Sequence, residues 1–98
     1  MTGTTRSSSD LDPRRRKALF RSWHRGTREM DLVLGRFADA EIDKLTDEEL
    51  TVFEHLMEAP DRDLFTWLTG SAETPANYDT PVFRRIRSYY ELNDEARA

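Results

Sequence analysis

The stretch Arg25-Gly26-Thr27-Arg28-Glu29-Met30-Asp31 concentrates the side chains of this sequence that could do chemistry. An arginine fork pairs with carboxylates, and a glycine permits unusual backbone conformations and lets a second backbone come close. We predict that this stretch, the polar corner, is a compact polar recognition surface. The structural alternative is a glycine that ends a helix, with local salt bridges around it. The predicted contact residues are Arg25, Gly26, Arg28, Glu29 and Asp31.

Catalytic and metal chemistry have little support in the sequence. Nucleophilic catalysis needs a Ser, Cys or Thr beside a base, and the two candidate bases, His24 and His55, lack the rest of a triad. The chain has no Cys, which excludes disulfides and thiolate ligands. Glu54 and Glu58 could share an ion but have no third ligand at matching spacing. With no P-loop and no dinucleotide fingerprint, we expect no catalytic residue, no metal and no firmly bound cofactor.

Helical spacing predicts the elements that position the polar corner. Asp12-Pro13 starts a helix over about 13–25, with Gly26 as its C-terminal stop. Thr27 caps a second helix whose apolar stripe runs to Phe37, and residues 38–44 form a connector in which Ile42 anchors to the core. The polar corner therefore lies between two helices.

Three further helices complete the prediction. Thr46 and Glu49 form a capping box, with Leu45 and Leu50 as a hydrophobic staple, and this third helix ends at Pro60. A short fourth helix runs from Asp61 to Gly70, and a polar loop follows over 71–79. Thr80-Pro81 starts the last helix. The fold class is all-α, a small single-domain bundle of about five short helices over 13–92, with a disordered extension (1–12) and a frayed tail (93–98).

The aromatic and basic residues of the helices have mostly structural interpretations. Helical spacing places most of six aromatics in the core, with the two tryptophans as the most exposed of them: Phe20, Trp23, Phe53, Phe65, Trp67 and Phe83. The run Arg14-Arg15-Arg16-Lys17 is typical of a solvated helix face. Its functional alternative is an electrostatic patch for an acidic partner or for phosphates.

Charge is unevenly distributed along these 98 residues. Residues 1–36 carry a net charge of +5 and residues 37–63 carry −8. A basic segment followed by an acidic one favours an oriented encounter with a partner protein and argues against nucleic acid. No apolar run approaches the roughly 20 residues of a membrane span, and the N-terminus lacks the apolar region of a secretory signal. We therefore expect the bacterial cytoplasm or an equivalent internal compartment.

Several blocks of the sequence resemble one known family. Arg25-Gly26-Thr27-Arg28-Glu29 resembles the RGxxE signature of the SdhE-type flavinylation factors, also called succinate dehydrogenase assembly factors. The blocks 45–58 and 61–68 resemble the same family, in the same order, and the resemblance covers about residues 14–90. One departure is His24, where the family often has Arg or Lys.

The resemblance implies a five-helix bundle that acts as an assembly chaperone. It would bind the flavoprotein subunit of succinate dehydrogenase, and by extension that of fumarate reductase, and promote covalent attachment of FAD to a histidine of that client. FAD would be the client's cofactor, and direct binding of FAD by this chain stays open. Arg25, Gly26 and Glu29 would contact the client, with Arg28 and Asp31 flanking. Arg25 would pair with a carboxylate or with carbonyls, and Glu29 would accept client donors or brace Arg25.

Two other classes of function compete with the resemblance. A helical adaptor unrelated to flavin would use the same polar corner. A helix-turn-helix nucleic-acid binder would place Gly26 in its turn and the arginine-rich helix on phosphates, although the acidic segment 39–63 argues against it. A free-standing enzyme ranks last because no catalytic constellation is present.

Overall fold

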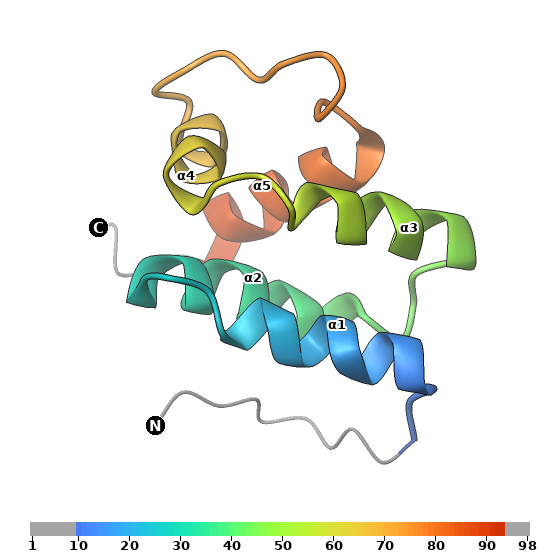
Figure 1. Ribbon diagram of the computed structural model, residues 1–98. Coiled ribbons are helices and arrows are strands. Elements are labelled where there is room, and N and C mark those ends of the chain that lie inside the picture. Colours follow the sequence, from blue (N-terminus) through green and yellow to red (C-terminus); the bar gives the residue numbers. More distant parts are fainter. Residues whose placement is uncertain (1–9, 94–98) are drawn as a thin grey trace.

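Five helices and their connections make up the described part of the computed structural model, residues 10–93 (Figure 1). Within that range no strand occurs, which confirms the predicted all-α fold. The helices are α1 (Pro13–Trp23), α2 (Arg28–Glu41), α3 (Asp47–Leu56), α4 (Asp61–Thr69) and α5 (Pro81–Asn93).

The helices start where the capping residues of the sequence predict. The Asp12 side chain accepts a backbone hydrogen bond at the start of α1, and Thr27 Oγ1 accepts the Met30 N–H at 3.2 Å at the start of α2. At α3 both bonds of the capping box between Thr46 and Glu49 are present. Side chains that satisfy the first free N–H groups therefore define these boundaries.

Three helix ends differ from the prediction. α3 ends at Leu56, four residues before Pro60, where we predicted its end. α1 ends at Trp23, two residues early, because the N–H groups of Arg25 and Gly26 bond to carboxylates instead of helix carbonyls. α2 continues to Glu41 through the expected connector, and the Ile42 N–H still bonds to the Ala38 carbonyl at 2.8 Å. Alanines in this segment favour the helix that we expected to stop.

The core draws on all five helices. α1 and α2 form an antiparallel pair, and α5 packs against α2, α3 and α4 (Figure 1). The rings of Phe37, Phe53 and Phe83 are fully buried, and so is Ile42, the predicted anchor after α2. Burial of such rings supplies most of the apolar area that a small domain needs.

Aromatic residues of α1 and α4 depart from the predicted exposure. Trp23 and Trp67, expected to be the most exposed, are only 7% and 8% exposed. Phe20, expected in the core, is 62% exposed. The Trp23 ring covers Gly35 of α2, and its Nε1 donates to Asp39 Oδ1 at 3.1 Å. The small Gly35 makes room for the indole, and this contact fixes α1 against α2.

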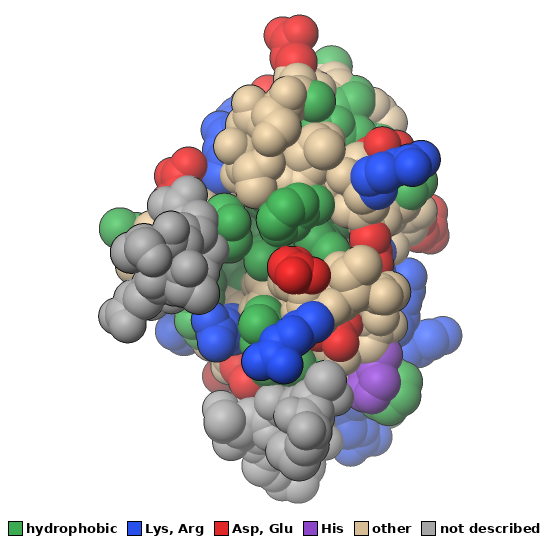
Figure 2. Space-filling model, turned by 90° about the vertical axis from the view of Figure 1, so that its left-hand side faces the viewer, with side chains coloured by type: hydrophobic (Ala, Val, Ile, Leu, Met, Phe, Trp, Pro, Cys, Tyr) green, Lys and Arg blue, Asp and Glu red, His purple; other side chains and the backbone are tan. Residues whose placement is uncertain are grey.

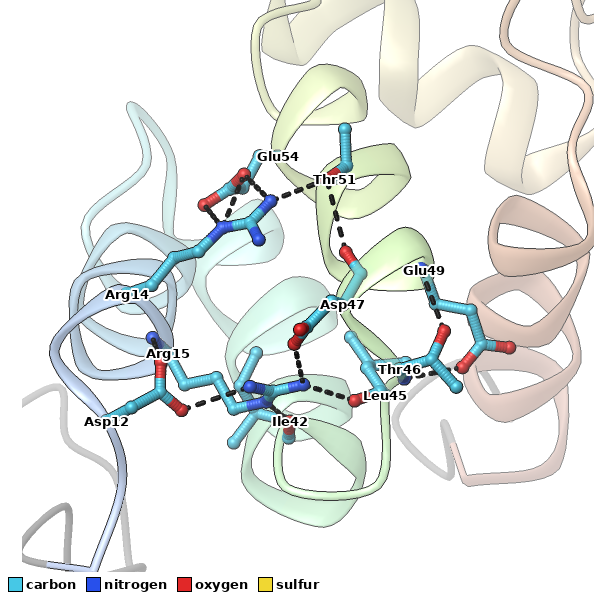
Figure 3. A network of polar contacts seen from close by, with 10 residues as sticks. All are labelled: Asp12, Arg14, Arg15, Ile42, Leu45, Thr46, Asp47, Glu49, Thr51 and Glu54. Carbon is cyan, nitrogen blue, oxygen red and sulfur yellow. Dashed lines mark hydrogen bonds and ion pairs between the residues drawn. The ribbon is translucent and has the colours of Figure 1, made fainter.

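Half of the basic run has a structural role (Figure 3). The Arg15 guanidinium donates to the carbonyl of Ile42 at 3.1 Å and to that of Leu45, and it pairs with Asp12 at 3.0 Å and with Asp47 at 3.4 Å. It therefore joins the start of α1 to the end of α2 and the start of α3. The prediction of a solvated face is wrong for this residue.

Arg14 joins α1 to α3. Its guanidinium binds the Glu54 carboxylate in a forked pair, with Nη2 at 2.7 Å from Oε1, and also donates to Thr51 Oγ1 at 2.6 Å (Figure 3). The hydrogen bond between Arg14 and Glu54 lowers the pKa of Glu54 and raises the pKa of Arg14. The basic run and the acidic segment thus meet inside the fold.

The folded part begins before Pro13. Leu11 is buried and Asp12 caps α1, so neither residue belongs to a disordered extension. Residues 1–9 and 94–98, for which we predict disorder and fraying, lie outside the described residues. Among the helices of residues 10–93, none has the length and apolarity to cross a membrane.

Candidate functional site

An ion pair between Arg25 and Asp61 organises the polar corner. Arg25 Nη2 lies 2.6 Å and Nε lies 2.8 Å from Asp61 Oδ1, and Nη2 also donates to the Ala59 carbonyl at 3.3 Å. The two side chains are only 11% and 18% exposed. A charge-assisted pair with this burial holds its geometry better than an exposed one. It joins the turn after α1 to the start of α4.

Gly26 is bound to the same carboxylate. Its N–H donates to the other oxygen, Asp61 Oδ2, at 2.7 Å. A Cβ at this position would lie 3.2 Å from that oxygen, tighter than ordinary contacts. Gly26 does not have a positive φ, which among the described glycines only Gly70 has. The absence of a side chain at Gly26 therefore eases its close approach to Asp61. The prediction that Gly26 ends α1 with an unusual conformation is wrong.

Asp31 closes the turn from the other side. Its Oδ1 accepts the Arg25 N–H at 2.5 Å, while Thr27 caps the helix between them. One carboxylate thus holds the backbone of Arg25 and Asp61 holds its side chain. Of the five predicted contact residues, the structure uses Arg25, Gly26 and Asp31 for internal bonds.

Arg28 and Glu29 are the outward-facing members of the polar corner. Both are exposed, and neither side chain makes a hydrogen bond or ion pair with residues 10–93. They are the first two residues of α2, where the positive end of the helix dipole favours the Glu29 carboxylate. Within residues 10–93, therefore, Glu29 does not brace Arg25, and no other described side chain occupies its oxygens.

Figure 2 shows the end of the molecule where the chain turns from α1 into α2. Basic, acidic and apolar side chains lie close together on this end. An open groove of about 480 Å³ lies elsewhere, between α2 and α5, and no residue of the polar corner lines it. The exposed Arg28 and Glu29 give the polar corner surface groups that suit contact with a macromolecule.

Metal-binding groups do not cluster in the described part of the chain. No set of three or more His, Cys, Asp or Glu side chains there is placed to hold an ion. Glu54, which we considered with Glu58, has its carboxylate bound by Arg14.

The sequence interpretation missed Asp61. We treated it as the start of a helix, and nothing local marks it as part of the corner, because it lies 36 positions from Arg25. The one available signal was the need of a partly buried arginine for a carboxylate partner.

Comparison with known proteins identifies the family. The Sdh5 family, described as "Flavinator of succinate dehydrogenase", matches residues 16–90. The FAD assembly factor SdhE of Acetobacter pasteurianus is 42% identical over 80 residues, which are 82% of this chain and 73% of that protein. SdhE of Legionella pneumophila is 40% identical over 63 residues, 64% of this chain and 80% of that protein.

A mitochondrial relative is longer than this chain. The succinate dehydrogenase assembly factor 2 of Dictyostelium discoideum is 37% identical over 81 residues, which are 83% of this chain but 57% of that protein. The family match itself spans every helix described above except the first three residues of α1 and the last three of α5. By this match over most of its length, and by the identity to the SdhE proteins, the chain belongs to the Sdh5 family of succinate dehydrogenase flavinators.

Proposed function

We propose that this chain binds the flavoprotein subunit of succinate dehydrogenase and promotes the covalent attachment of FAD to it. The observation that carries the proposal is the exposed Glu29 carboxylate, presented beside the Arg25–Asp61 pair in a chain of the Sdh5 family. A carboxylate on a rigid support accepts donors of a partner with little loss of side-chain freedom. Fumarate reductase as a further client, and the cytoplasm as the location, stay part of the proposal.

The proposed role is that of an assembly chaperone rather than an enzyme. The client supplies the covalent chemistry, and this chain holds the client's parts in a productive orientation. Holding reacting groups in the correct orientation lowers the free-energy barrier of a reaction substantially. FAD is then the client's cofactor, and no firm FAD site is assigned to this chain.

The bonds within the polar corner support a division of roles among its residues. Glu29 and Arg28 contact the client, while Arg25, Gly26 and Asp31 hold the shape that presents them. This division refines the expectation that Arg25 itself pairs with a client group, because the Asp61 carboxylate already binds the Arg25 guanidinium.

A reconstituted reaction tests the proposal. Purified apo-flavoprotein subunit is incubated with FAD and this chain, and covalent flavin is read by in-gel fluorescence after denaturation. Glu29→Ala is compared with Glu48→Ala, which removes an exposed glutamate from the same helical position, the second residue of α3. We expect Glu48→Ala to support flavinylation like the wild type and Glu29→Ala to reduce it at least tenfold. Equal activity of the two variants would refute the role of Glu29.

A further inference from the structure

The outer face of α1 carries an exposed aromatic residue among cations. Ala18, Leu19, Ser22 and Trp23 are buried on the inner face. The outward residues at helical spacing are Arg16, Lys17, Phe20, Arg21 and His24. Phe20 is 62% exposed, one of two large hydrophobic side chains this exposed in the described residues. A single exposed apolar residue is common on protein surfaces, so only the residues around Phe20 can indicate whether it binds a partner.

Phe20 is held in one orientation. Its ring stacks on the His24 ring with centroids 3.9 Å apart and planes 15° apart. His24 Nδ1 donates to the Phe20 carbonyl at 2.7 Å, which fixes the imidazole as well. An aromatic side chain that is already ordered loses little conformational entropy when it binds a partner. Aromatic residues of this kind often anchor protein interfaces.

Two of the cations around Phe20 form no ion pair within the described residues, unlike their neighbours in sequence. Arg16 and Lys17 are exposed and make no ion pair with residues 10–93, whereas Arg14 and Arg15 are used inside the fold. The charge of Lys17 helps to lower the pKa of Glu54, but it is Arg14 that binds that carboxylate directly. Positive charge is thus left over on this face for a partner.

The outer face of α1 leads along the chain into the polar corner, because His24 directly precedes Arg25 and both His24 and residues 26–29 are exposed. We propose that this face is a second contact for the same flavoprotein subunit, with Phe20 as an apolar anchor and Arg16 and Lys17 facing an acidic segment of that subunit. The inference rests on the proposed function. A partner that reached both Glu29 and Phe20 would be fixed in angle as well as in position.

Binding of the purified apo-flavoprotein subunit to Phe20→Ala tests the anchor. The matched control is Leu92→Ala on α5, which removes the other exposed large hydrophobic side chain. We expect Phe20→Ala to raise the Kd about tenfold or more, as for an interface anchor, and Leu92→Ala to leave it unchanged. An unchanged Kd for Phe20→Ala would overturn the inference. Absence of binding by the wild type would instead refute the proposed function.

The charge component has its own test. Arg16→Gln is compared with Arg84→Gln, which removes an arginine of α5 that pairs with Asp79. We expect Arg16→Gln to slow association and to reduce its dependence on salt, and Arg84→Gln to change neither. Equal salt dependence of the two variants would overturn the acidic contact. Competition by duplex DNA, with a steep salt slope, would assign this face to nucleic acid instead.

Discussion

Arg25 belongs to the interior of the polar corner rather than to its outer surface. Its guanidinium binds Asp61 and the Ala59 carbonyl, and its side chain is 11% exposed. We therefore expect a substitution of Arg25 to affect client binding through the shape of the turn. Only Glu29 and Arg28 of the predicted set offer side chains that are free among residues 10–93.

Asp61 should matter as much as the signature residues themselves. Asp61→Ala leaves the Arg25 guanidinium partly buried without its carboxylate, and we expect a loss of about 1–3 kcal/mol in the free energy of unfolding. Client binding should fall with it. Urea denaturation and a binding titration measure the two effects. Asp63→Ala, an exposed aspartate two residues on, is the control. Identical behaviour of both variants would contradict the role of Asp61.

Gly26 should tolerate alanine better than arginine. Its φ is not positive, so alanine brings no backbone strain and only the 3.2 Å contact with Asp61 Oδ2 must relax. We expect Gly26→Ala to lower client binding modestly and Gly26→Arg to abolish it while circular dichroism still reports a helical bundle. Binding of Gly26→Arg at wild-type strength would contradict this account. As a control, Gly70→Ala strains a φ of 81° in open space, so it should cost about 1 kcal/mol of stability without affecting binding.

The sequence identified the residues of the polar corner but not their division of labour. Spacing and charge pointed to the stretch from Arg25 to Asp31 as a candidate site, because core packing does not explain so many charged residues in one turn. Which side chains face inward depended on Asp61, a distant residue, and no local rule pairs the two. The resemblance to a family supplied the partner, which the physical pattern alone left open.

At the scale of the helices, starts were predicted better than ends. A start is defined by a side chain that bonds three residues ahead, so Thr27 and Thr46 mark it locally. The early end of α1 depends on Asp31 and Asp61. Phe20 was misplaced because periodicity alone did not separate a buried position from one on the edge of the helix face.

The packing of α1 on α2 should be sensitive to Gly35. A Cβ there would lie 2.3 Å from Trp23 Cδ2, and the indole is buried and bonded to Asp39. We expect Gly35→Ala to lower the free energy of unfolding by about 1–3 kcal/mol through overpacking. Chemical denaturation measures this loss, and Trp23→Leu should relieve part of it in the double variant. A loss that the second substitution does not change would show that the ring is not the obstacle.

The contact between α1 and α3 should depend on pH. The bond to Arg14 lowers the folded pKa of Glu54, so the folded state favours the ionised carboxylate. This contribution is complete above the ordinary carboxyl pKa of about 4 and is lost as pH falls through the lowered folded value. We expect Glu54→Gln to flatten the fall in Tm between about pH 5 and 2. Glu48→Gln, which removes a carboxylate without an ion pair in the described residues, should leave the slope unchanged. Equal slopes for both variants would contradict the prediction.

At the scale of the whole molecule, the charge asymmetry has a use that its sequence pattern did not reveal. We expected the basic first third and the acidic middle to orient an encounter with a partner. Within the fold, three arginines of the basic segment also pair with carboxylates of the acidic one: Arg14 with Glu54, Arg15 with Asp47, and Arg25 with Asp61. The cations left over, among them Arg16, Lys17 and Arg28, lie on the outer face of α1 and at the polar corner.

The central claim is that this chain is needed for covalent flavin on the succinate dehydrogenase flavoprotein subunit and acts through Glu29. The most direct measurement deletes the gene in its host and reads the covalent flavin band of that subunit after denaturing electrophoresis. We predict that the band disappears, that wild type and Glu48→Ala restore it, and that Glu29→Ala does not. An undiminished band in the deletion strain would contradict the account.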